Sequence, residues 1–443
     1  MIKTNSISLL FLFLLFITTA CQENQESTPL ETQVLAKKSF LKGTLEDGNI
    51  KSISYDEEAI NINEDGTFSF ETELKYATLG YLTVNGDQNE VFLSPGKTTS
   101  LSITKDGLQF SGDLETENGQ LMSDKKINAK LGSYLENNWY SIHTKPEEEF
   151  LTIIDSVKGL FLSSMEKTNA EHGLSEEFMA TNQASLNYSF DRMILRYPEW
   201  YKRFTGQDIQ LSEQALSSIQ SKTDAPQFQS LDSYEKYVRT YWDKEIQKRF
   251  AQQKDTSIYF GKQKTDIALQ MINEQFKNKE AIDYWTFEFI KNHIDSYTWV
   301  NGKVYLDDFM ANCTTPAVCN EAKDFEQELL AEREGHDIQI YKSPKGYQLE
   351  AHIFKPENFN ASNTYAALAA FHGGGWVQGH ASWTFESAKH AAENGLIGIA
   401  VEYRLSNYED VTPQEAMQDT RDAIQWIRAN AANLSIDSNK IIG

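Results

Sequence analysis

The chain has 443 residues, of which 40% are hydrophobic and 12% aromatic, and its formal net charge is −23 at pH 7. This length suggests about three domains, and the apolar content is sufficient for packed cores. A strongly acidic chain repels both nucleic-acid phosphates and anionic lipid headgroups, so we expect no nucleic-acid partner and no docking through a basic face.

Residues 1–20 have the features of a targeting segment and are excluded from the predicted fold. Lys3 supplies a positive charge, residues 9–17 are apolar without a break, and small residues precede Cys21. The segment resembles a bacterial lipoprotein signal, which implies that Cys21 is lipidated and that the lipid attaches the protein to a membrane. An ordinary cleaved secretory signal is the alternative. Because Gln22 and not Asp follows the cysteine, the resemblance to sorted lipoproteins implies the bacterial cell envelope, at the outer membrane.

Residues 21–38 are polar and acidic and are interpreted as a tether. Residues 39–115 alternate in short runs separated by turn dipeptides such as Asp65-Gly66, Asn85-Gly86 and Asp106-Gly107. The pattern predicts a small antiparallel β domain, a sandwich or a barrel, with a role in spacing or binding. The stretch resembles the β domain at the N-terminus of bacterial lipoproteins that carry a thioredoxin-like domain further along.

From residue 116 to 335 the hydrophobic period becomes helical, which predicts an irregular all-α domain. One helix is expected to begin at Pro146 and to end at Gly173, and residues 316–335 are expected to form the last helix. The aromatic stripes of these helices are interpreted as core. Three isolated histidines are interpreted as ordinary surface or capping residues: His143, His172 and His293.

Cys313 and Cys319 are separated by Thr314–Val318. Two interpretations stay open, a local disulfide and a redox pair. The Cys-x-x-Cys spacing of redox motifs is not present.

The last part of the chain, residues 336–443, alternates strand and helix signals. A hairpin over residues 337–354 is expected to precede a buried strand at 365–371 that leads into His372-Gly373-Gly374-Gly375-Trp376. The glycines lack a Cβ, so the backbone can bend sharply and bring its N–H groups close to a ligand. The elements expected next are a helix with Ser382 as N-cap, a strand at 396–401, a helix opened by a Thr412 capping box, and a strand from Lys440.

This region resembles the N-terminal half of an α/β-hydrolase of the HGGG, hormone-sensitive-lipase-like, esterase and lipase type. The resemblance implies a three-layer α/β/α arrangement with a mostly parallel sheet, a Ser-dependent carboxylic-ester hydrolase, a small ester substrate, and neither cofactor nor metal. It also implies that the N–H groups of Gly374 and Gly375 form an oxyanion hole and that His372 organises their loop.

Arg404 follows a buried strand, and Asp419 and Asp422 are i and i+3 on the next helix. We expect Arg404 to pair with at least one of these carboxylates and to fix the loop between Tyr403 and Thr412.

In this family the nucleophile elbow G-x-S-x-G follows the strand that begins at Lys440, and the acid and the catalytic His come later. The sequence contains no G-x-S-x-G. We therefore expect the nucleophile, acid and base to lie beyond Gly443, and these 443 residues to be inactive alone. The alternative is a non-catalytic, anchored binding or assembly lipoprotein with a decayed hydrolase domain. The oligomeric state is not indicated.

Overall fold

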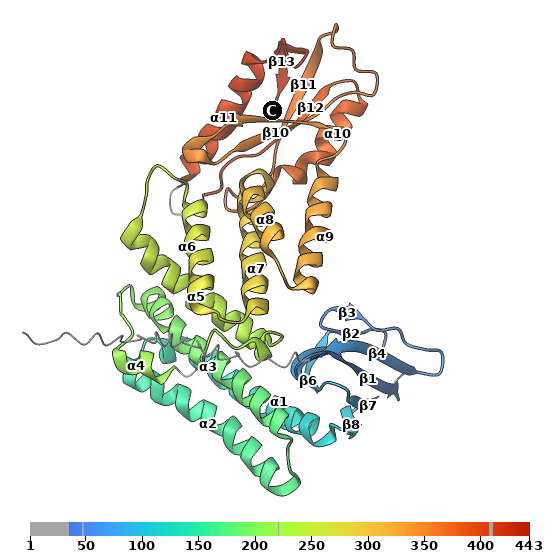
Figure 1. Cartoon of the computed structure of the whole chain (residues 1–443), viewed down its shortest axis with the longest axis vertical. Coiled ribbons are helices and arrows are strands. Elements are labelled where there is room, and N and C mark those ends of the chain that lie inside the picture. The colour runs from blue at the N-terminus through green and yellow to red at the C-terminus, as the bar shows by residue number, and fades with distance from the viewer. Residues whose placement is uncertain (1–34, 47, 220, 407–410) are drawn as a thin grey trace, which may run out of the picture.

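The computed structural model describes residues 35–46, 48–219, 221–406 and 411–443. The predicted signal segment, Cys21 and most of the predicted tether lie outside these residues. The described chain runs from two packed β-sheets through a series of helices to a third sheet flanked by helices (Figure 1). None of the helices in these ranges is long and apolar enough to cross a lipid bilayer.

Two four-stranded sheets form the N-terminal β region. The first has the order β4-β1-β7-β8, with β1 (Lys37–Leu45), β4 (Thr67–Leu74), β7 (Thr98–Thr104) and β8 (Gly107–Gly112). The second has the order β3-β2-β5-β6, with β2 (Ile53–Tyr55), β3 (Glu58–Ala59), β5 (Thr78–Val84) and β6 (Asp87–Leu93). Leu41, Leu82 and Val91 are fully buried in one cluster drawn from both sheets.

The prediction of a wholly antiparallel β domain is wrong at one pairing. Strand β1 pairs in parallel with β7, with Leu41 opposite Thr99. The strands between them in the sequence include those of the second sheet, so the chain leaves the first sheet and re-enters it in the original direction. A parallel neighbour requires such a crossover connection.

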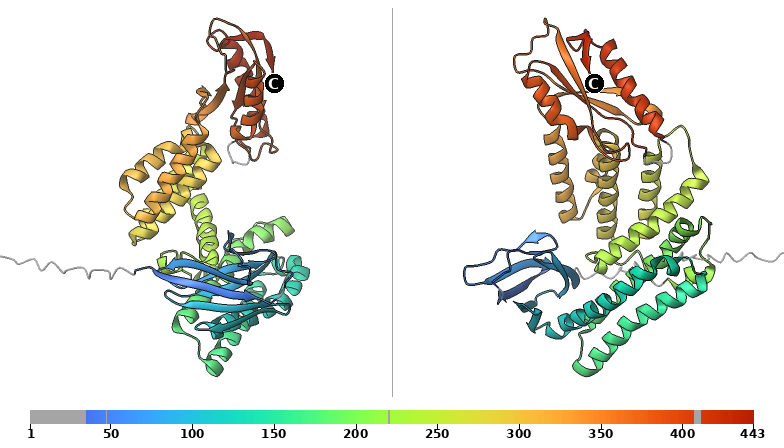
Figure 2. Two further views of the ribbon diagram at one scale, coloured as in Figure 1. Left: turned by 90° about the vertical axis from the view of Figure 1, so that its right-hand side faces the viewer. Right: turned by 180° about the vertical axis from the view of Figure 1, so that it is seen from behind.

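Nine helices with the following bounds occur in the described residues between the β region and the C-terminal sheet: α1 (Glu115–His143), α2 (Glu147–His172), α3 (Glu176–Thr205), α4 (Glu213–Ser218), α5 (Asp232–Gln253), α6 (Phe260–Gln275), α7 (Lys279–Tyr297), α8 (Trp299–Asn312) and α9 (Pro316–Glu332). Helix α2 has three glutamates in its first turn, which suits the helix dipole, and it ends at Gly173 with φ 73°. Helices α6 to α9 lie between the remaining helices and the C-terminal sheet (Figures 1 and 2).

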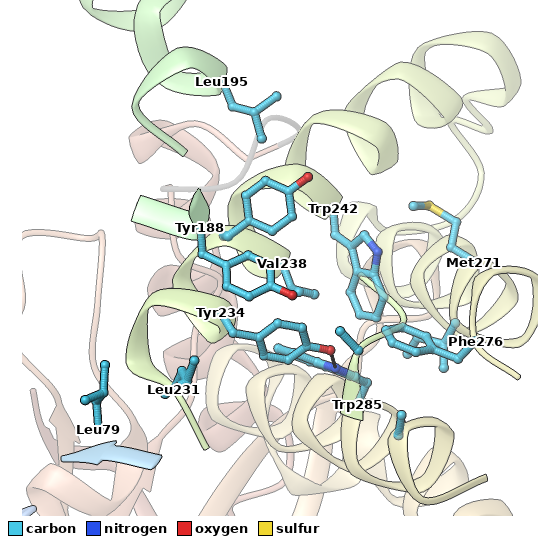
Figure 3. Packing of buried hydrophobic residues seen from close by; sticks show 14 of the residues in the cluster. Leu79, Tyr188, Leu195, Leu231, Tyr234, Val238, Trp242, Met271, Phe276 and Trp285 are labelled. Atoms are coloured by element: carbon cyan, nitrogen blue, oxygen red, sulfur yellow. Dashed lines mark hydrogen bonds between the residues drawn. The ribbon is translucent and has the colours of Figure 1, made fainter. Parts of the chain in front are cut away.

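The aromatic stripes of these helices form a core. Trp242 and Trp285 are fully buried with ring centroids 5.2 Å apart. The indole N–H of Trp285 donates to the Tyr234 hydroxyl at 3.3 Å (Figure 3). Leu79 of β5 belongs to the same cluster, so the β region and the helices share buried apolar surface.

The interpretation of the helical-region histidines as surface or capping residues is wrong for His293, whereas His143, although buried, lies in the last turn of α1 with its Nδ1 2.8 Å from the Trp139 carbonyl oxygen, as a capping residue does. His143 is 1% exposed and His293 is 2% exposed. The His293 ring lies 2.8 Å from the Thr265 hydroxyl and 3.2 Å from the Tyr259 hydroxyl, and burial lowers its pKa to about 4. Hydroxyl partners from distant segments allow a neutral imidazole to be buried, and spacing along the chain does not show them. His172 is exposed at the end of α2.

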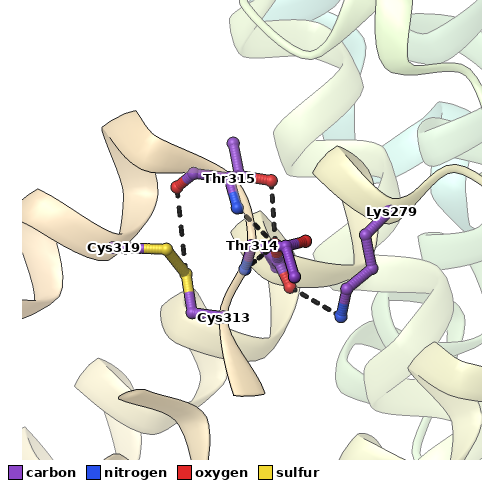
Figure 4. The surroundings of a disulfide bond; sticks show 6 residues. Lys279, Cys313, Thr314, Thr315 and Cys319 are labelled. Carbon is purple, nitrogen blue, oxygen red and sulfur yellow. Dashed lines mark hydrogen bonds and ion pairs between the residues drawn. A yellow bond between two sulfur atoms is a disulfide. The ribbon is translucent and has the colours of Figure 1, made fainter. Parts of the chain in front are cut away.

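Cys313 and Cys319 form a disulfide at the start of α9 (Figure 4). This is the first of the two interpretations that the sequence left open. The bond closes the short segment that joins α8 to α9.

The same segment is held by the carboxylate of Asp283 on α7. Its Oδ2 accepts from the backbone N–H groups of Thr314 and Thr315 at 3.0 and 2.9 Å, and from their hydroxyls at 3.1 and 2.8 Å. Its Oδ1 lies 3.0 Å from the Lys279 ammonium. Burial opposes ionisation, but the hydrogen bonds from Lys279 and the two threonines lower the pKa of Asp283.

The C-terminal sheet has the order β13-β11-β12-β10-β9. Its strands are β9 (Asp337–Lys342), β10 (Leu349–Phe354), β11 (Tyr365–Phe371), β12 (Ile397–Val401) and β13 (Ile436–Ile442). Strand β11 is parallel to β12 and β13, whereas β10 is antiparallel to β12 and β9. The prediction of a mostly parallel sheet is therefore wrong. In the described sheet, the two parallel pairings, β11–β12 and β11–β13, are matched by two antiparallel pairings, β10–β12 and β10–β9, which the hairpin β9–β10 contributes.

Helices α10 (Phe385–Glu393) and α11 (Pro413–Ala429) cover opposite faces of this sheet. Ile399 packs in one cluster with residues of α11, whereas the next residue, Ala400, packs in another with residues of α10. Successive strand residues point to opposite faces, so the region has three layers. A Cβ at Gly398 would lie 1.9 Å from the Ala388 carbonyl oxygen, so this glycine permits the close approach of α10.

The capping predictions had different outcomes. Thr412 and Glu415 form the predicted capping box of α11. Ser382 is not the N-cap of α10, because a short 3₁₀ turn (Ala381–Thr384) precedes that helix and Thr384 occupies the cap position. The Thr384 hydroxyl bonds back to the Ala381 carbonyl at 2.8 Å, which stabilises the turn in place of a capped start.

Candidate functional site

The glycine loop, residues 372–381, begins where β11 ends, at the edge where the parallel strands β11 and β12 both terminate. Gly374 has φ 112° and Gly375 has φ 62°. Trp376 also has a positive φ, 65°, which is uncommon for a residue with a side chain. The loop therefore uses backbone conformations that glycine adopts at little cost.

The turn leaves two backbone donors available. A Cβ on Gly374 would lie 2.0 Å from the Gln378 carbonyl oxygen, whereas the space beside Gly375 is open. Val377 N–H bonds to the Gly374 carbonyl at 3.1 Å and closes the turn. Within the described ranges, no residue accepts a hydrogen bond from the N–H of Gly374 or Gly375. Both groups can therefore donate to a ligand.

His372 lies beneath the loop and is 4% exposed. Its Nδ1 is 2.9 Å from the Gly373 carbonyl oxygen, and its ring stacks on Tyr403 with centroids 4.1 Å apart and planes at 8°. The Tyr403 hydroxyl donates to the His372 carbonyl at 2.7 Å. Burial raises the pKa of Tyr403 to about 12, so this hydroxyl keeps its proton at neutral pH. These contacts fix the start of the loop.

Glu402 is a further buried neighbour, 4% exposed, that the sequence analysis did not single out. One of its oxygens accepts from the Ala381 N–H at 2.9 Å, and the other lies 3.5 Å from Nε2 of His372. The only sequence feature that could have indicated a role for Glu402 is its position after a strand. Glu402 and Tyr403 directly follow β12, and residues that follow adjacent parallel strands meet at the same sheet edge.

Arg404 is buried and pairs with Asp419 through two side-chain contacts, Nε to Oδ2 at 2.7 Å and NH2 to Oδ1 at 3.0 Å. Asp422 instead binds Lys342 of β9 at 2.5 Å, and the same ammonium contacts Asp419 at 2.5 Å. Burial opposes the charged form of Lys342, but its hydrogen bonds to Asp419 and Asp422 raise its pKa. The network joins α11 and β9 to the segment that follows β12.

Two exposed tryptophans lie in the loop and just after it. Trp376 is 44% exposed and Trp383 is 57% exposed. The Trp376 carbonyl accepts from both the N–H and the hydroxyl of Ser406, at 2.6 and 3.0 Å. In the part of the chain that the structure covers, no group of three or more His, Cys, Asp or Glu side chains is placed to hold a metal ion. The chemistry that the loop offers is hydrogen-bond donation from backbone N–H groups.

Comparisons with known proteins point to the same region. The BD-FAE family model, which is α/β-hydrolase-like, matches residues 352–443. An AB hydrolase superfamily protein of Schizosaccharomyces pombe is 32% identical over 121 residues, covering 26% of this chain and 34% of that protein. A non-reducing polyketide synthase of Stereocaulon alpinum is 22% identical over 173 residues, covering 37% of this chain and 7% of that protein.

Among solved structures, a thermophilic esterase of Thermogutta terrifontis aligns with 29% identity and a TM-score of 0.24, covering 25% of this chain and 39% of that chain. The present chain thus spans about a third of the length of the hydrolase relative. Residues 352–443 are therefore similar to α/β-hydrolase-like proteins.

Proposed function

We propose that the C-terminal region serves a Ser-dependent carboxylic-ester hydrolase in which the N–H groups of Gly374 and Gly375 form the oxyanion hole. The observation that carries the proposal is the pair of N–H groups without an acceptor among the described residues. They lie at the end of a buried parallel strand, within the stretch that matches α/β-hydrolases. Backbone donors at the carboxyl end of a strand suit an oxyanion, because they need no reorganisation when the charge develops.

In the proposed reaction a serine hydroxyl attacks the ester carbonyl while a histidine takes its proton. The tetrahedral intermediate carries its negative charge on the former carbonyl oxygen, which the two glycine N–H groups bind. Collapse releases the alcohol, and water then hydrolyses the acyl-enzyme. The proposal assigns serine, acid and general base to no residue of this chain, since G-x-S-x-G does not occur in it.

The proposal includes an N-terminal lipid at Cys21, which would place the protein in the bacterial cell envelope, at the outer membrane. A non-catalytic, anchored binding or assembly lipoprotein with a decayed hydrolase domain is the second candidate. Ester turnover by the complete natural polypeptide separates the two candidates.

The test compares two glycines with left-handed conformations and open space at the Cβ position. Gly375 has φ 62° and Gly395 has φ 81°, and only Gly375 lies in the glycine loop. Both Gly→Ala changes carry a similar conformational cost, about 1–2 kcal/mol. We expect Gly375→Ala to lower kcat more than Gly395→Ala does, with little change in KM, because the positive φ that alanine disfavours is also what directs the Gly375 N–H towards the oxyanion. Complete loss of one donor, about 10²–10³-fold, is the upper limit of the effect.

The assay is hydrolysis of p-nitrophenyl acetate by the full natural polypeptide, with the 443-residue chain measured in parallel. We expect no turnover by the 443-residue chain above a denatured control. Equal kcat values for the two alanine variants would remove Gly375 from the mechanism. Turnover by the 443-residue chain would show that the nucleophile is among the residues interpreted here as structural.

A further inference from the structure

Both ends of the glycine loop meet a single carboxylate. Glu402 accepts from the N–H of Ala381, the last residue of the loop, at 2.9 Å through Oε2. Its Oε1 faces Nε2 of His372, the first residue of the loop, at 3.5 Å. All three residues are buried, with exposures of 4% or less. Glu402 therefore contacts both ends of the segment that carries the glycine turn.

The hydrogen-bond partners of the His372 ring determine which of its two nitrogens carries a hydrogen. Nδ1 lies 2.9 Å from the Gly373 carbonyl oxygen, which only accepts, so Nδ1 carries a hydrogen. Nε2 then presents a lone pair unless a proton lies between it and Glu402. An ionised carboxylate also only accepts, so two acceptors would otherwise face each other in a buried position.

Nε2 has no hydrogen-bond partner in the structure although it is buried. The 3.5 Å separation from Glu402 lies beyond the usual 2.7–3.2 Å range. A small approach of the two groups around one proton would satisfy both. An unsatisfied buried polar atom is costly, which favours that arrangement.

We propose that Glu402 is a positioning residue of the glycine loop. It holds His372 through a proton shared between Nε2 and Oε1, and it holds the Ala381 amide through its second oxygen. The adjacent Tyr403 supports the same end of the loop, because it stacks on the His372 ring and donates to the His372 carbonyl. The kinetic consequence rests on the proposed function, but the clamp itself does not.

The clamp acts at a distance from the ester. In the proposed mechanism the substrate contacts Gly374 and Gly375, and Glu402 contacts only the two ends of their loop. Loss of the clamp should therefore misdirect the glycine N–H groups in the transition state, with little effect on ground-state binding. We expect kcat to fall and KM to change little.

Two substitutions of Glu402 differ in whether they keep its contacts to the two ends of the loop. In Glu402→Gln, the amide oxygen can accept from Ala381 N–H while the amide NH₂ donates to the Nε2 lone pair of a neutral ring. This variant should keep both ends of the loop in place. Glu402→Ala removes both contacts. Asp283→Ala is the matched control, because it removes an equally buried carboxylate, 2% exposed, whose partners lie in the helical region.

The first measurement is hydrogen exchange of the Ala381 amide in the 443-residue chain, which needs no catalytic activity. We expect exchange to be at least about tenfold faster in Glu402→Ala, and within about twofold of the parent in Glu402→Gln and Asp283→Ala. The ¹⁵N shifts of His372 should show a protonated Nδ1 in the parent and in Glu402→Gln. Unchanged Ala381 exchange in Glu402→Ala, or equal loss in Glu402→Gln, would overturn the clamp.

The second measurement is ester hydrolysis by the full natural polypeptide. We expect kcat about 10–100-fold lower in Glu402→Ala, with KM within about threefold and near-parent kcat in Glu402→Gln. If the parent does not hydrolyse esters, the proposed function fails while the exchange data still decide on the clamp. If the parent is active and Glu402→Ala keeps its kcat, the clamp fails and the proposed function stands.

Discussion

Replacing Asp419 with Ala should destabilise the C-terminal region far more than replacing its neighbour Asp422. Asp419 is 0% exposed and accepts from Arg404 and Lys342 at 2.5 to 3.0 Å. The change leaves the guanidinium of Arg404, a residue that is 8% exposed, without its principal carboxylate. Breaking a buried pair in this way typically costs about 3–5 kcal/mol. The side chain of Asp422 is 31% exposed, so its pair with Lys342 is worth only about 0–1 kcal/mol.

The assay should report on this region by itself, because a long chain with several cores need not unfold in one step. Hydrogen exchange of the amides in α11 and β12 meets this requirement. At about 1.4 kcal/mol per factor of ten, a loss of 3–5 kcal/mol corresponds to exchange roughly 10²- to 10³-fold faster or more. Asp422→Ala should change it by less than about tenfold. Equal effects of the two substitutions would refute the assignment of the pair to Asp419.

Two further predictions concern other parts of the chain. The folded-state pKa of Asp283 is lowered, so its ionised form contributes stability above its unfolded pKa of about 3.9, and this contribution is lost as pH falls through the folded value. Asp283→Asn should therefore destabilise the helices α7 to α9, measured by hydrogen exchange relative to the parent at the same pH, more at pH 7 than at pH 3, and an equal loss at both pH values would contradict the reasoning. If Cys21 is lipidated, the mature protein should partition into the detergent phase of Triton X-114, and Cys21→Ser should move it to the aqueous phase or leave it uncleaved. Unchanged partitioning of this variant would show that another group attaches the protein.

The sequence predicted elements well where a local signal determines them. Strand β11 occupies the predicted residues because an unbroken apolar run precedes the glycines, and α11 begins at its capping box. The start of α10 was placed wrongly because Ser382 satisfies a capping pattern while the actual turn is held by a Thr384–Ala381 contact. The parallel pairing of β1 with β7 was also missed, because it joins segments that are far apart in the chain.

The residues of the candidate site also differ in whether a local sequence signal reveals them. Its glycines are visible in the sequence because the turn requires them, and His372 precedes them directly. Glu402 and Tyr403 follow a different strand, and their role depends on the parallel register of β11 and β12, which places Phe371 beside Val401. Burial of His293 likewise depends on Tyr259 and Thr265 from another helix and its preceding loop. Such contacts are tertiary, so spacing along the chain carries no record of them.

Direct hydrogen bonds join the helical region to the sheet that carries the glycine loop. Arg333, just after α9, forms two bonds to buried Glu350 of β10, at 2.9 and 2.6 Å. The carbonyl of Glu350 in turn accepts the N–H of Glu402 at 2.9 Å.

A second tie joins α8 to the start of β10. The side chain of Asn301 donates to the Gln348 carbonyl at 2.9 Å and accepts its N–H at 2.8 Å. Beside these ties, a cavity of about 230 Å³ is lined by Arg333 and Glu350 together with Glu402. A chain of direct bonds therefore runs from α9 through β10 to the backbone of Glu402. Through these contacts the helices contribute to the geometry of the candidate site.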